Sequence, residues 1–499
     1  MSIRVSRRWI LAGLGAAAAP GLAPGAVLAG PPAASLRPRM RVAGFASDAG
    51  AEALIARFGL PGDVACAVAD VTSGKRLESI RGSAGMPPAS VAKIVTSLYA
   101  LDRLGSGHRF VTRVIATGPV RNGVLQGDLI LAGGGDPTLD TDGLADLAAR
   151  MKRAGIREVR GQFRVYDGAL PYARSIDATQ PDHLGYSPAV SGLALNFNRV
   201  HFQWTRGAKG YAVAMDARSD RYRPDVTMAR MRVVDRRMPV YTYRDQNGID
   251  DWTVASGALG KGGSRWLPVR RPALYAGDVF RTMARAHGIT LRPAVVTERL
   301  PGGTELARQT SAPLREILRL MLKYSNNLTA EMVGMSASAV GGAAPRSLRA
   351  SAEEMSRWAG RALGMGQTRL VDHSGLSDAS RMTPDDLVTA LVAVRKTGVL
   401  RPLLKPFPMR DTRGKLIKNH PIRVDAKTGT LYFVSGLGGF LTAPDGTELA
   451  FAIFTADLPH RARSKTAQDE VPQGARPWNR KSKQLQQKLI ERWGAVYRG

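Results

Sequence analysis

A serine and a lysine at the start of an apolar helix constrain this chain more than any other feature. Residues 87–93 (PPASVAK) run into apolar side chains at helical spacing, which predicts a buried helix ending near Leu104. Side chains three residues apart share a helix face, so the Cβ atoms of Ser90 and Lys93 are expected about 5–6 Å apart. The amine can then take the hydroxyl proton, and free N–H groups in the first turn suit an oxyanion. This predicts a nucleophilic serine, although a helix-start serine with a solvated lysine explains the segment equally well on its own.

The N-terminal residues resemble an export signal. Two arginines in residues 6–9 (SRRW) precede an Ala-, Gly- and Leu-rich run that ends in the small-residue pattern of residues 27–29 (VLA). This predicts a twin-arginine signal over residues 1–29 and a periplasmic location for the cleaved protein. Prolines and glycines within the run disfavour a membrane anchor. The single cysteine, Cys66, excludes an internal disulfide, so the exported fold must rest on its apolar core.

The charge balance is strongly basic. The chain of 499 residues has 71 Lys and Arg against 41 Asp and Glu, a formal net charge of +30. The basic residues are scattered and accompany no nucleic-acid-binding motif, so we expect no nucleic acid partner. Peripheral association with an anionic envelope surface explains the charge better. The densest basic stretch, residues 461–483, is predicted to be a mobile loop before a terminal helix over residues 482–493.

Two later motifs strengthen the catalytic interpretation. Ser325 and Asn327 end an apolar helix as Ser-x-Asn, where the hydroxyl can relay a proton and the amide can hold a substrate carbonyl or Lys93. A polar turn between two helices is the alternative for this segment. Residues 427–430 (KTGT) start a strand that is expected to reach Leu441, with a free edge for an extended substrate. Its glycine would let this strand approach the nucleophile closely.

A second Lys-Thr-Gly, at residues 396–398, provides an internal comparison. It closes a helix that begins at the capping residue Thr383, and a cation and a glycine are expected at such a helix end for capping alone. It therefore needs no catalytic explanation. Ser90 has no competitor of its kind, because no other serine in the chain is followed by a lysine three residues later.

Ser-x-x-Lys, Ser-x-Asn and Lys-Thr-Gly in this order are the signature of the penicillin-binding protein and serine β-lactamase superfamily. The chain resembles one branch, the class C D-alanyl-D-alanine carboxypeptidase and endopeptidase family of penicillin-binding protein 4 type. The long insertion between Lys93 and Ser325 is typical of that branch. Two positions depart from its pattern: His373 stands where glycine is usual, and Asp378 where arginine is common. The segments that carry the resemblance are residues 87–93, 134–139, 195–200, 325–331 and 372–377.

The resemblance implies a mixed α/β (α+β) fold. We expect a transpeptidase domain of the penicillin-binding protein and β-lactamase type, with an antiparallel sheet between helical layers. This catalytic domain should comprise residues 42–109 and 267–499. A large strand-rich insertion should form two nested smaller domains, one from residues 110–140 and 205–266 and the other from residues 141–204.

The resemblance also implies an activity. We expect an exported serine D-Ala-D-Ala carboxypeptidase that forms an acyl-enzyme on Ser90 and acts on peptidoglycan peptides, with DD-endopeptidase activity left open. β-Lactam antibiotics are the expected inhibitors, and no metal or cofactor is expected. A β-lactamase or esterase of the same superfamily and a catalytically weak peptidoglycan-binding envelope protein are the alternatives. The catalytic group is expected to comprise Ser90, Lys93, Ser325, Asn327 and Lys427, and the substrate-binding group Thr428, Gly429 and Thr430.

The expected mechanism needs an uncharged base. Burial and the positive charge of Lys427 are expected to keep Lys93 neutral. The backbone N–H groups of Ser90 and Thr430 would form the oxyanion hole, and Lys427 with its two neighbouring threonines would face the terminal carboxylate of the substrate.

Overall fold

The computed structural model describes residues 50–497 except residues 343–344, 412 and 467–471. The predicted export signal lies outside the described residues. Within the part of the chain that the structure describes, no helix combines the length and the apolar character needed to cross a bilayer.

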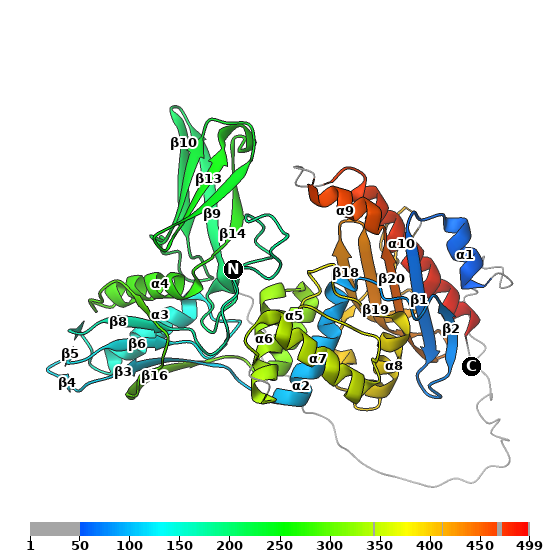
Figure 1. The fold of residues 1–499 in the computed structure, drawn as a ribbon, viewed down its shortest axis with the longest axis horizontal. Coiled ribbons are helices and arrows are strands. Elements are labelled where there is room, and N and C mark those ends of the chain that lie inside the picture. Colours follow the sequence, from blue (N-terminus) through cyan, green and yellow to red (C-terminus); the bar gives the residue numbers. More distant parts are fainter. Residues whose placement is uncertain (1–49, 343–344, 412, 467–471, 498–499) are drawn as a thin grey trace, which may run out of the picture. The chain divides into compact units, whose positions relative to one another are not determined.

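A six-stranded antiparallel sheet combines strands from the first and last parts of the described chain (Figure 1). Its strand order is β17-β18-β19-β20-β1-β2. The central strand β19 is buried along its whole length, because helices cover both faces of the sheet. The strands are β1 (Asp63–Asp70), β2 (Arg76–Ile80), β17 (Lys405–Pro406), β18 (Arg423–Leu431), β19 (Val434–Thr442) and β20 (Glu448–Ala456).

Two apolar cores form on the two faces of this sheet. Alternate side chains of β1 and β20 pack on opposite sides, as the period-two geometry of a strand requires. On one side lies the larger helical layer: α2 (Lys93–Leu104), α5 (Leu314–Tyr324), α6 (Asn327–Val340), α7 (Leu348–Leu363) and α8 (Pro384–Arg395). On the other side lie α1 (Ala51–Phe58) and α10 (Ala475–Val496), and Cys66 is buried there.

The inserted region contains a five-stranded sheet of order β15-β8-β6-β3-β16, with two helices packed against it. Two three-stranded sheets follow, β10-β9-β14 and β11-β13-β12, and a small sheet β4-β5-β7 completes the region. The elements of the five-stranded part are β3 (Val111–Ala116), β6 (Leu129–Ala132), α3 (Thr141–Arg153), β8 (Phe163–Tyr166), α4 (Pro272–Ala286), β15 (Val295–Thr297) and β16 (Thr304–Thr310). The others are β4 (Val120–Arg121), β5 (Val124–Leu125), β7 (Glu158–Val159), β9 (Arg199–Gly207), β10 (Gly210–Asp216), β11 (Ala229–Val234), β12 (Tyr241–Gln246), β13 (Ile249–Ala255) and β14 (Gly262–Pro268).

The sheet pairing corrects the expected domain boundaries. We expected residues 267–499 to belong to the catalytic domain, but β15 pairs with β8 and β16 pairs with β3, so residues up to Thr310 extend the five-stranded sheet. The segment 141–204, expected as a separate domain, divides as well: α3 and β8 belong with the five-stranded sheet, and β9 begins a three-stranded one. Strand partners distant in sequence decide these boundaries, and local patterns do not reveal them.

The C-terminal region also differs from the prediction. The basic stretch expected as a loop is helical over most of its described residues, because α9 (Leu458–Thr466) covers its start and α10 begins at Ala475, before the predicted Ser482. The strand expected to run from residues 427–430 to Leu441 is two strands, since β18 ends at Leu431 and a turn at Phe433, with φ of 59°, precedes β19. The two strands pair as a tight hairpin.

Candidate active site

Ser90 lies in a 3₁₀ turn over Ala89–Ala92 that leads directly into α2, where we had expected the first turn of an α-helix. The turn packs against β18. A Cβ atom built on Gly429 would lie 2.7 Å from the carbonyl oxygen of Pro88 and 2.9 Å from the backbone nitrogen of Ser90. Only glycine permits this approach, as the sequence predicted, and it places the edge of β18 beside Ser90.

Lys93 is completely buried, and its amine has three oxygen neighbours. The Nζ atom lies 3.0 Å from Ser90 Oγ, 2.8 Å from Asn327 Oδ1 and 2.8 Å from the carbonyl oxygen of Ser374. A neutral amine has two N–H donors and one lone pair, whereas the two carbonyl oxygens can only accept. The two N–H groups therefore point to Asn327 and Ser374, and the lone pair is left for the hydroxyl proton of Ser90.

Burial lowers the pKa of Lys93 to about 8, and the carboxylates of Glu331 and Asp372 partly oppose this effect. The sequence had assigned part of the shift to the charge of Lys427. The structure corrects this assignment, because the two carboxylates are the charged groups that act on Lys93. The two lysines do interact in the reverse sense, because the charge of Lys93 is one of the causes that lower the pKa of Lys427.

The Ser-x-Asn motif forms the junction of α5 and α6. Ser325 ends α5 with φ of 60°, and the side chain of Asn326 caps α6 by accepting from the N–H of Thr329 at 2.9 Å. The amide of Asn327, the first residue of α6, bridges two groups: Oδ1 accepts from Lys93 and Nδ2 donates to the carbonyl of Tyr186 at 2.9 Å. The segment is thus a capped turn between two helices. It also places Ser325 against Lys427 and Asn327 against Lys93.

Lys427 forms the second serine–lysine pair. Its Nζ donates to Ser325 Oγ at 2.9 Å and to the carbonyl of Thr428 at 2.6 Å, and the residue is 2% exposed. Burial lowers the pKa of Lys427 well below its ordinary value, and the charges of Lys93 and Lys405 add to this effect. A bound carboxylate would supply the counter-charge that this buried amine lacks.

Alternation along β18 separates the motif into two faces. Lys427 and Gly429 are buried and point toward the helical layer, whereas Thr428 and Thr430 are exposed on the opposite face. The short strand β17 pairs only with residues 425 and 426 of β18. The backbone of residues 427–431 thus lies at the sheet edge, where an extended substrate can pair with it.

Two buried carboxylates that the sequence did not assign hold the loop behind Lys93. Glu331 accepts from the N–H groups of His373 and Ser374, both at 2.9 Å. Asp372 accepts from the N–H groups of Gly375 at 2.9 Å and Ser377 at 2.7 Å. Together they fix the carbonyl of Ser374, which orients Lys93. Burial raises the pKa of both groups, to about 8 for Glu331. Both lie in segments that carry the family resemblance, which was the available signal.

The first departure from the family pattern, His373, fits into a buried space between α6 and α7. Its ring is fully buried, with Nε2 2.8 Å from Ser351 Oγ, and burial lowers its pKa to about 3. A Cβ atom on Gly334 would lie 2.2 Å from this ring, so the glycine on α6 makes room for it. The histidine is a neutral packing residue behind the site.

The second departure, Asp378, is partly exposed and forms an ion pair with a buried arginine. Its Oδ2 accepts from Arg461 Nε at 2.6 Å, and Arg461 Nη1 donates to the carbonyl of Tyr432 at 3.0 Å. Arg461 is 5% exposed, so it does not belong to the basic surface in which the sequence placed it. It instead ties α9 to the loop after the Ser374 segment and to the end of β18.

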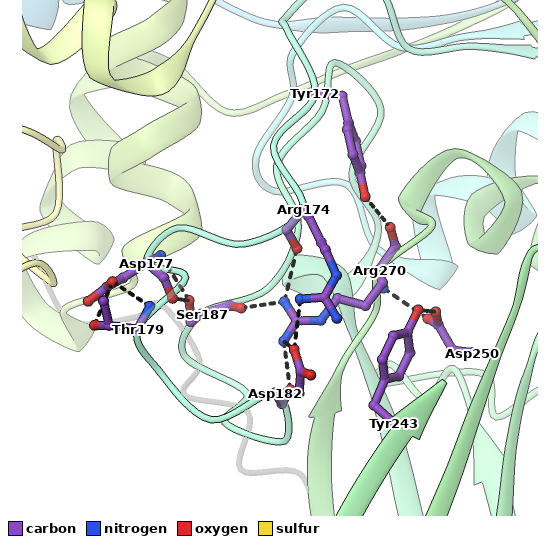
Figure 2. A network of polar contacts seen from close by, with 9 residues as sticks. All are labelled: Tyr172, Arg174, Asp177, Thr179, Asp182, Ser187, Tyr243, Asp250 and Arg270. Carbon is purple, nitrogen blue, oxygen red and sulfur yellow. Dashed lines mark hydrogen bonds and ion pairs between the residues drawn. The ribbon is translucent and has the colours of Figure 1, made fainter. Parts of the chain in front are cut away.

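A buried arginine positions the segment that contacts Asn327. Figure 2 shows the polar contacts of this arginine. The guanidinium of Arg270 donates to the carbonyl oxygens of Arg174 at 3.0 Å, Ser187 at 2.8 Å and Asp182 at 2.6 Å. Its backbone N–H donates to Asp250, which also accepts from the hydroxyl of Tyr243. One side chain thus satisfies three carbonyls of the 172–188 segment, adjacent to Tyr186.

The arrangement can perform nucleophilic acyl transfer. Ser90 has a base within hydrogen-bond distance, the base has a fixed orientation, and a free strand edge lies beside both. Among the described residues, no group of three or more His, Cys, Asp or Glu side chains is placed to hold a metal ion.

This fold and the paired serines and lysines define an active-site-serine enzyme of the penicillin-binding protein and β-lactamase class. The chain belongs to the D-Ala-D-Ala carboxypeptidase 3 (S13) family, whose model matches residues 51–476. Membership makes it a serine-type D-Ala-D-Ala carboxypeptidase, which confirms the expected family and activity.

Curated relatives agree with this assignment. The D-alanyl-D-alanine carboxypeptidase of Actinomadura sp. strain R39 is 30% identical over 424 residues, which cover 77% of this chain and 76% of that protein. The D-alanyl-D-alanine carboxypeptidase DacB of Haemophilus influenzae is 25% identical over 422 residues, covering 79% and 86%. The crystal structure of penicillin-binding protein 4 (dacB) from Haemophilus influenzae matches with a TM-score of 0.70 at 19% identity, covering 89% of this chain and 99% of that one. This structural match confirms the expected fold class.

Proposed function

We propose that this enzyme is exported and hydrolyses the D-Ala-D-Ala termini of peptidoglycan stem peptides through an acyl-enzyme on Ser90. The observation that carries the proposal is the coordination of Lys93, whose two N–H groups are taken by Asn327 and Ser374 so that the lone pair faces Ser90. The twin-arginine pattern in residues 6–9 supports export to the periplasm.

In the acylation step, Ser90 Oγ attacks the carbonyl carbon between the two D-Ala residues while Lys93 accepts the hydroxyl proton. The N–H groups of Ser90 and Thr430 stabilise the oxyanion. The C–N bond then breaks, and the leaving D-Ala amine takes the proton that Lys93 had accepted, for which the hydroxyl of Ser325 is a suitable relay; Lys93 is then neutral again. Water attacks the acyl-enzyme, with Lys93 again as base, and releases the shortened peptide and free Ser90.

The terminal carboxylate of the substrate binds at the Lys-Thr-Gly-Thr segment. Lys427 supplies a cation held by Ser325, and the hydroxyls of Thr428 and Thr430 lie at the exposed edge of β18. Gly429 keeps this edge close to Ser90. A β-lactam has a carboxylate and a reactive amide at comparable positions, so it should acylate the same serine. A crystal structure of the Haemophilus influenzae protein in complex with a β-lactam is consistent with this expectation for a relative.

Labelling with a fluorescent penicillin and mapping of the modified peptide test the proposal. We expect the label on Ser90, with no labelling of Ser90→Ala and unchanged labelling of Ser106→Ala, an exposed serine just beyond α2. A label on any other serine would overturn the assignment of the nucleophile. Release of the label within seconds would instead favour the β-lactamase alternative, and intact Ser90 without labelling or turnover would favour the binding protein.

A further inference from the structure

A second cavity, of about 540 Å³, lies where the inserted region meets α5 and the start of α6. We call it the α5 cavity. Of the side chains that the proposed mechanism uses, Ser325 and Asn327 stand in its wall, whereas Ser90, Lys93 and Lys427 do not line it. The cavity therefore adjoins the acylation site without being part of it.

Most of the wall of the α5 cavity is apolar. Ile317, Leu320, Met321 and Tyr324 recur at helical spacing, so they share one face of α5, and Phe197 of the inserted region lines the cavity with them. Leu320 and Tyr324 are 42% and 68% exposed. An apolar face of this kind in the wall of a cavity suits the apolar body of a small ligand.

Arg199 is the one charged side chain among the described residues that line this cavity. Its Cζ atom lies 5.4 Å from the ring centre of Phe197 and 5.5 Å from that of Trp266. Its Nε atom is buried without a hydrogen-bond partner, and no carboxylate in the described part of the chain pairs with the guanidinium. Burial accordingly lowers the pKa of Arg199, opposed by the phenol of Tyr275. A buried cation of this kind is costly unless a counter-charge is supplied.

The backbone before Arg199 is held in a strained conformation. Asn196, Phe197 and Asn198 have φ of 50°, 56° and 51°, in the left-handed region that few side chains adopt. The side chain of Asn198 holds this turn by hydrogen bonds to two backbone groups, at 3.0 and 2.8 Å. The turn belongs to residues 195–200, which carry the family resemblance and have no part in the proposed mechanism. It brings an aromatic ring and a cation to one cavity, and strain of this kind is typical of ligand sites.

We propose that the α5 cavity binds a small amphipathic carboxylate, with its carboxylate on Arg199 and its apolar body against the exposed face of α5. A guanidinium pairs with a carboxylate through two parallel hydrogen bonds, and the carboxylate supplies the missing counter-charge. One cation matches a singly charged carboxylate better than a phosphate group, which carries close to two charges at neutral pH. A neutral apolar ligand would leave the guanidinium unpaired.

The bound carboxylate also acts on the catalytic lysine. It contacts the inserted region and α5 together, so it favours the arrangement in which the two lie side by side. In that arrangement the carbonyl of Tyr186 accepts from Asn327, whose Oδ1 atom orients Lys93. Occupation of the cavity therefore speeds acylation of Ser90. The binding site is independent of the proposed function, whereas this coupling rests on it.

Calorimetric titration of the full chain with octanoate tests the site, and octanol, which has the same chain and a neutral head, is the matched ligand. We expect the wild type to bind octanoate at least about tenfold more tightly than octanol. Arg199→Met should bind both equally, because it lacks the cation. Leu320→Gln should weaken both, because it alters the apolar face. Arg206→Met, which changes an exposed arginine of the same strand β9, should leave both affinities unchanged.

Thermal unfolding separates a ligand site from a structural arginine. Methionine fills the space beside Phe197 and Trp266 and removes an unpaired buried charge, so Arg199→Met should melt at the wild-type temperature or above it. Octanoate should raise the melting temperature of the wild type and not that of this variant. A variant that melts at a lower temperature, and that octanoate still stabilises, would show that Arg199 supports the fold, and the inference would be wrong.

Two further results of the titrations would overturn the inference. One is equal affinity of the wild type for octanoate and octanol. The other is octanoate binding that is lost in Lys427→Ala and kept in Arg199→Met, since the carboxylate would then occupy the active site.

The coupling is tested by the rate at which a fluorescent penicillin labels Ser90. Saturating octanoate should raise this rate by about twofold or more in the wild type and leave it unchanged in Arg199→Met. An unchanged or lower rate in the wild type would overturn the coupling. Failure of the proposed function is distinguishable, because a wild type that binds octanoate through Arg199 but is not labelled at Ser90 would contradict that function while confirming the binding site.

Discussion

Lys93 can act as a base only while its amine is uncharged, and its surroundings decide the pH at which this condition is met. Burial disfavours the charged form and lowers the pKa to about 8, against the pull of Glu331 and Asp372. Raising the pH through about 8 therefore increases the neutral fraction. We predict that kcat/KM for a small D-Ala-D-Ala peptide rises with pH along a limb centred near pH 8.

The measurement is a pH–rate profile under conditions where the enzyme stays folded, checked by its circular dichroism spectrum. A profile that is flat between about pH 6 and pH 9 would show that another group, or no titrating base, governs acylation.

Substitution of Glu331 provides a second test of what sets the pKa of Lys93. Its two carboxylate oxygens accept from the N–H groups of His373 and Ser374, and its charge raises the pKa of Lys93. Glu331→Gln removes the charge and leaves one N–H facing an amide NH₂. We predict that the pH limb moves to lower pH and that kcat falls by about tenfold, because the Ser374 carbonyl no longer holds the amine firmly.

The direction of the shift separates this role from a purely structural one. A variant that is merely less stable would show a lower melting temperature with the pH limb unmoved, and a limb that moves to higher pH would contradict the electrostatic argument. Glu354→Gln on α7 is a suitable control, since that carboxylate pairs with surface arginines.

At the residue scale, the sequence was informative wherever chemistry depends on short spacing. Ser90 and Lys93 share a turn, and Ser325 and Asn327 flank a capping residue, so residue type and separation were enough to single them out. Glu331 gave no such signal. Its importance depends on a loop that begins about 40 residues later and folds back over α6.

The same short motif has different roles in a helix and in a strand, as the two Lys-Thr-Gly copies show. Lys396 follows the last turn of α8 and is exposed, with Gly398 at φ of 68°. Lys427 lies within β18 and is buried against Ser325. The helix-end role predicted for the first copy is confirmed.

We predict that Lys427→Ala lowers kcat/KM by about 100-fold or more, because it removes the cation proposed to meet the substrate carboxylate. Lys396→Ala should leave kcat/KM unchanged and lower the free energy of unfolding by about 0.3–1 kcal/mol. Steady-state kinetics and thermal unfolding of both variants provide the measurement. Similar kinetic losses in the two variants would refute the distinction.

Element boundaries were harder to predict than element types. The helix α8 was predictable at both ends because Thr383 caps it and a glycine closes it. The start of α10 was missed, since its first turns are rich in Arg, Lys and Asn, and their helicity depends on burying Trp478 in the core. The placement of β15 and β16 required knowledge of their distant partners in the five-stranded sheet.

At the scale of the whole molecule, several segments of the inserted region lie against the Ser325–Asn327 junction, and one of them contacts Asn327 by a hydrogen bond. The carbonyl of Tyr186 accepts from Asn327, whose other end orients Lys93, and the segment that carries Tyr186 is held by Arg270. The insertion is therefore connected to Lys93 by a chain of hydrogen bonds. Hydrogen bonds connect the buried arginine to the amine, and Ile176 of the same segment packs in an apolar cluster with Leu328 and Met332 of α6.

We predict that Arg270→Met weakens both stability and catalysis. The guanidinium satisfies three carbonyl oxygens, those of Arg174, Asp182 and Ser187, and it is 2% exposed. The loss of these three hydrogen bonds should lower the free energy of unfolding by about 2–4 kcal/mol. The released segment should no longer fix Asn327, so kcat should fall by about threefold to tenfold at temperatures where the variant remains folded.

Arg270→Lys is the matched control for charge. A lysine keeps the positive charge but cannot reach three carbonyls with a planar fork, so we expect it to restore little of the lost stability. Limited proteolysis should cut residues 172–188 faster in both variants than in the wild type, which reports release of the segment independently of activity. If cleavage of the segment accelerates while kcat is unaffected, the contact between Tyr186 and Asn327 does not serve catalysis, and the insertion must influence the site by another route.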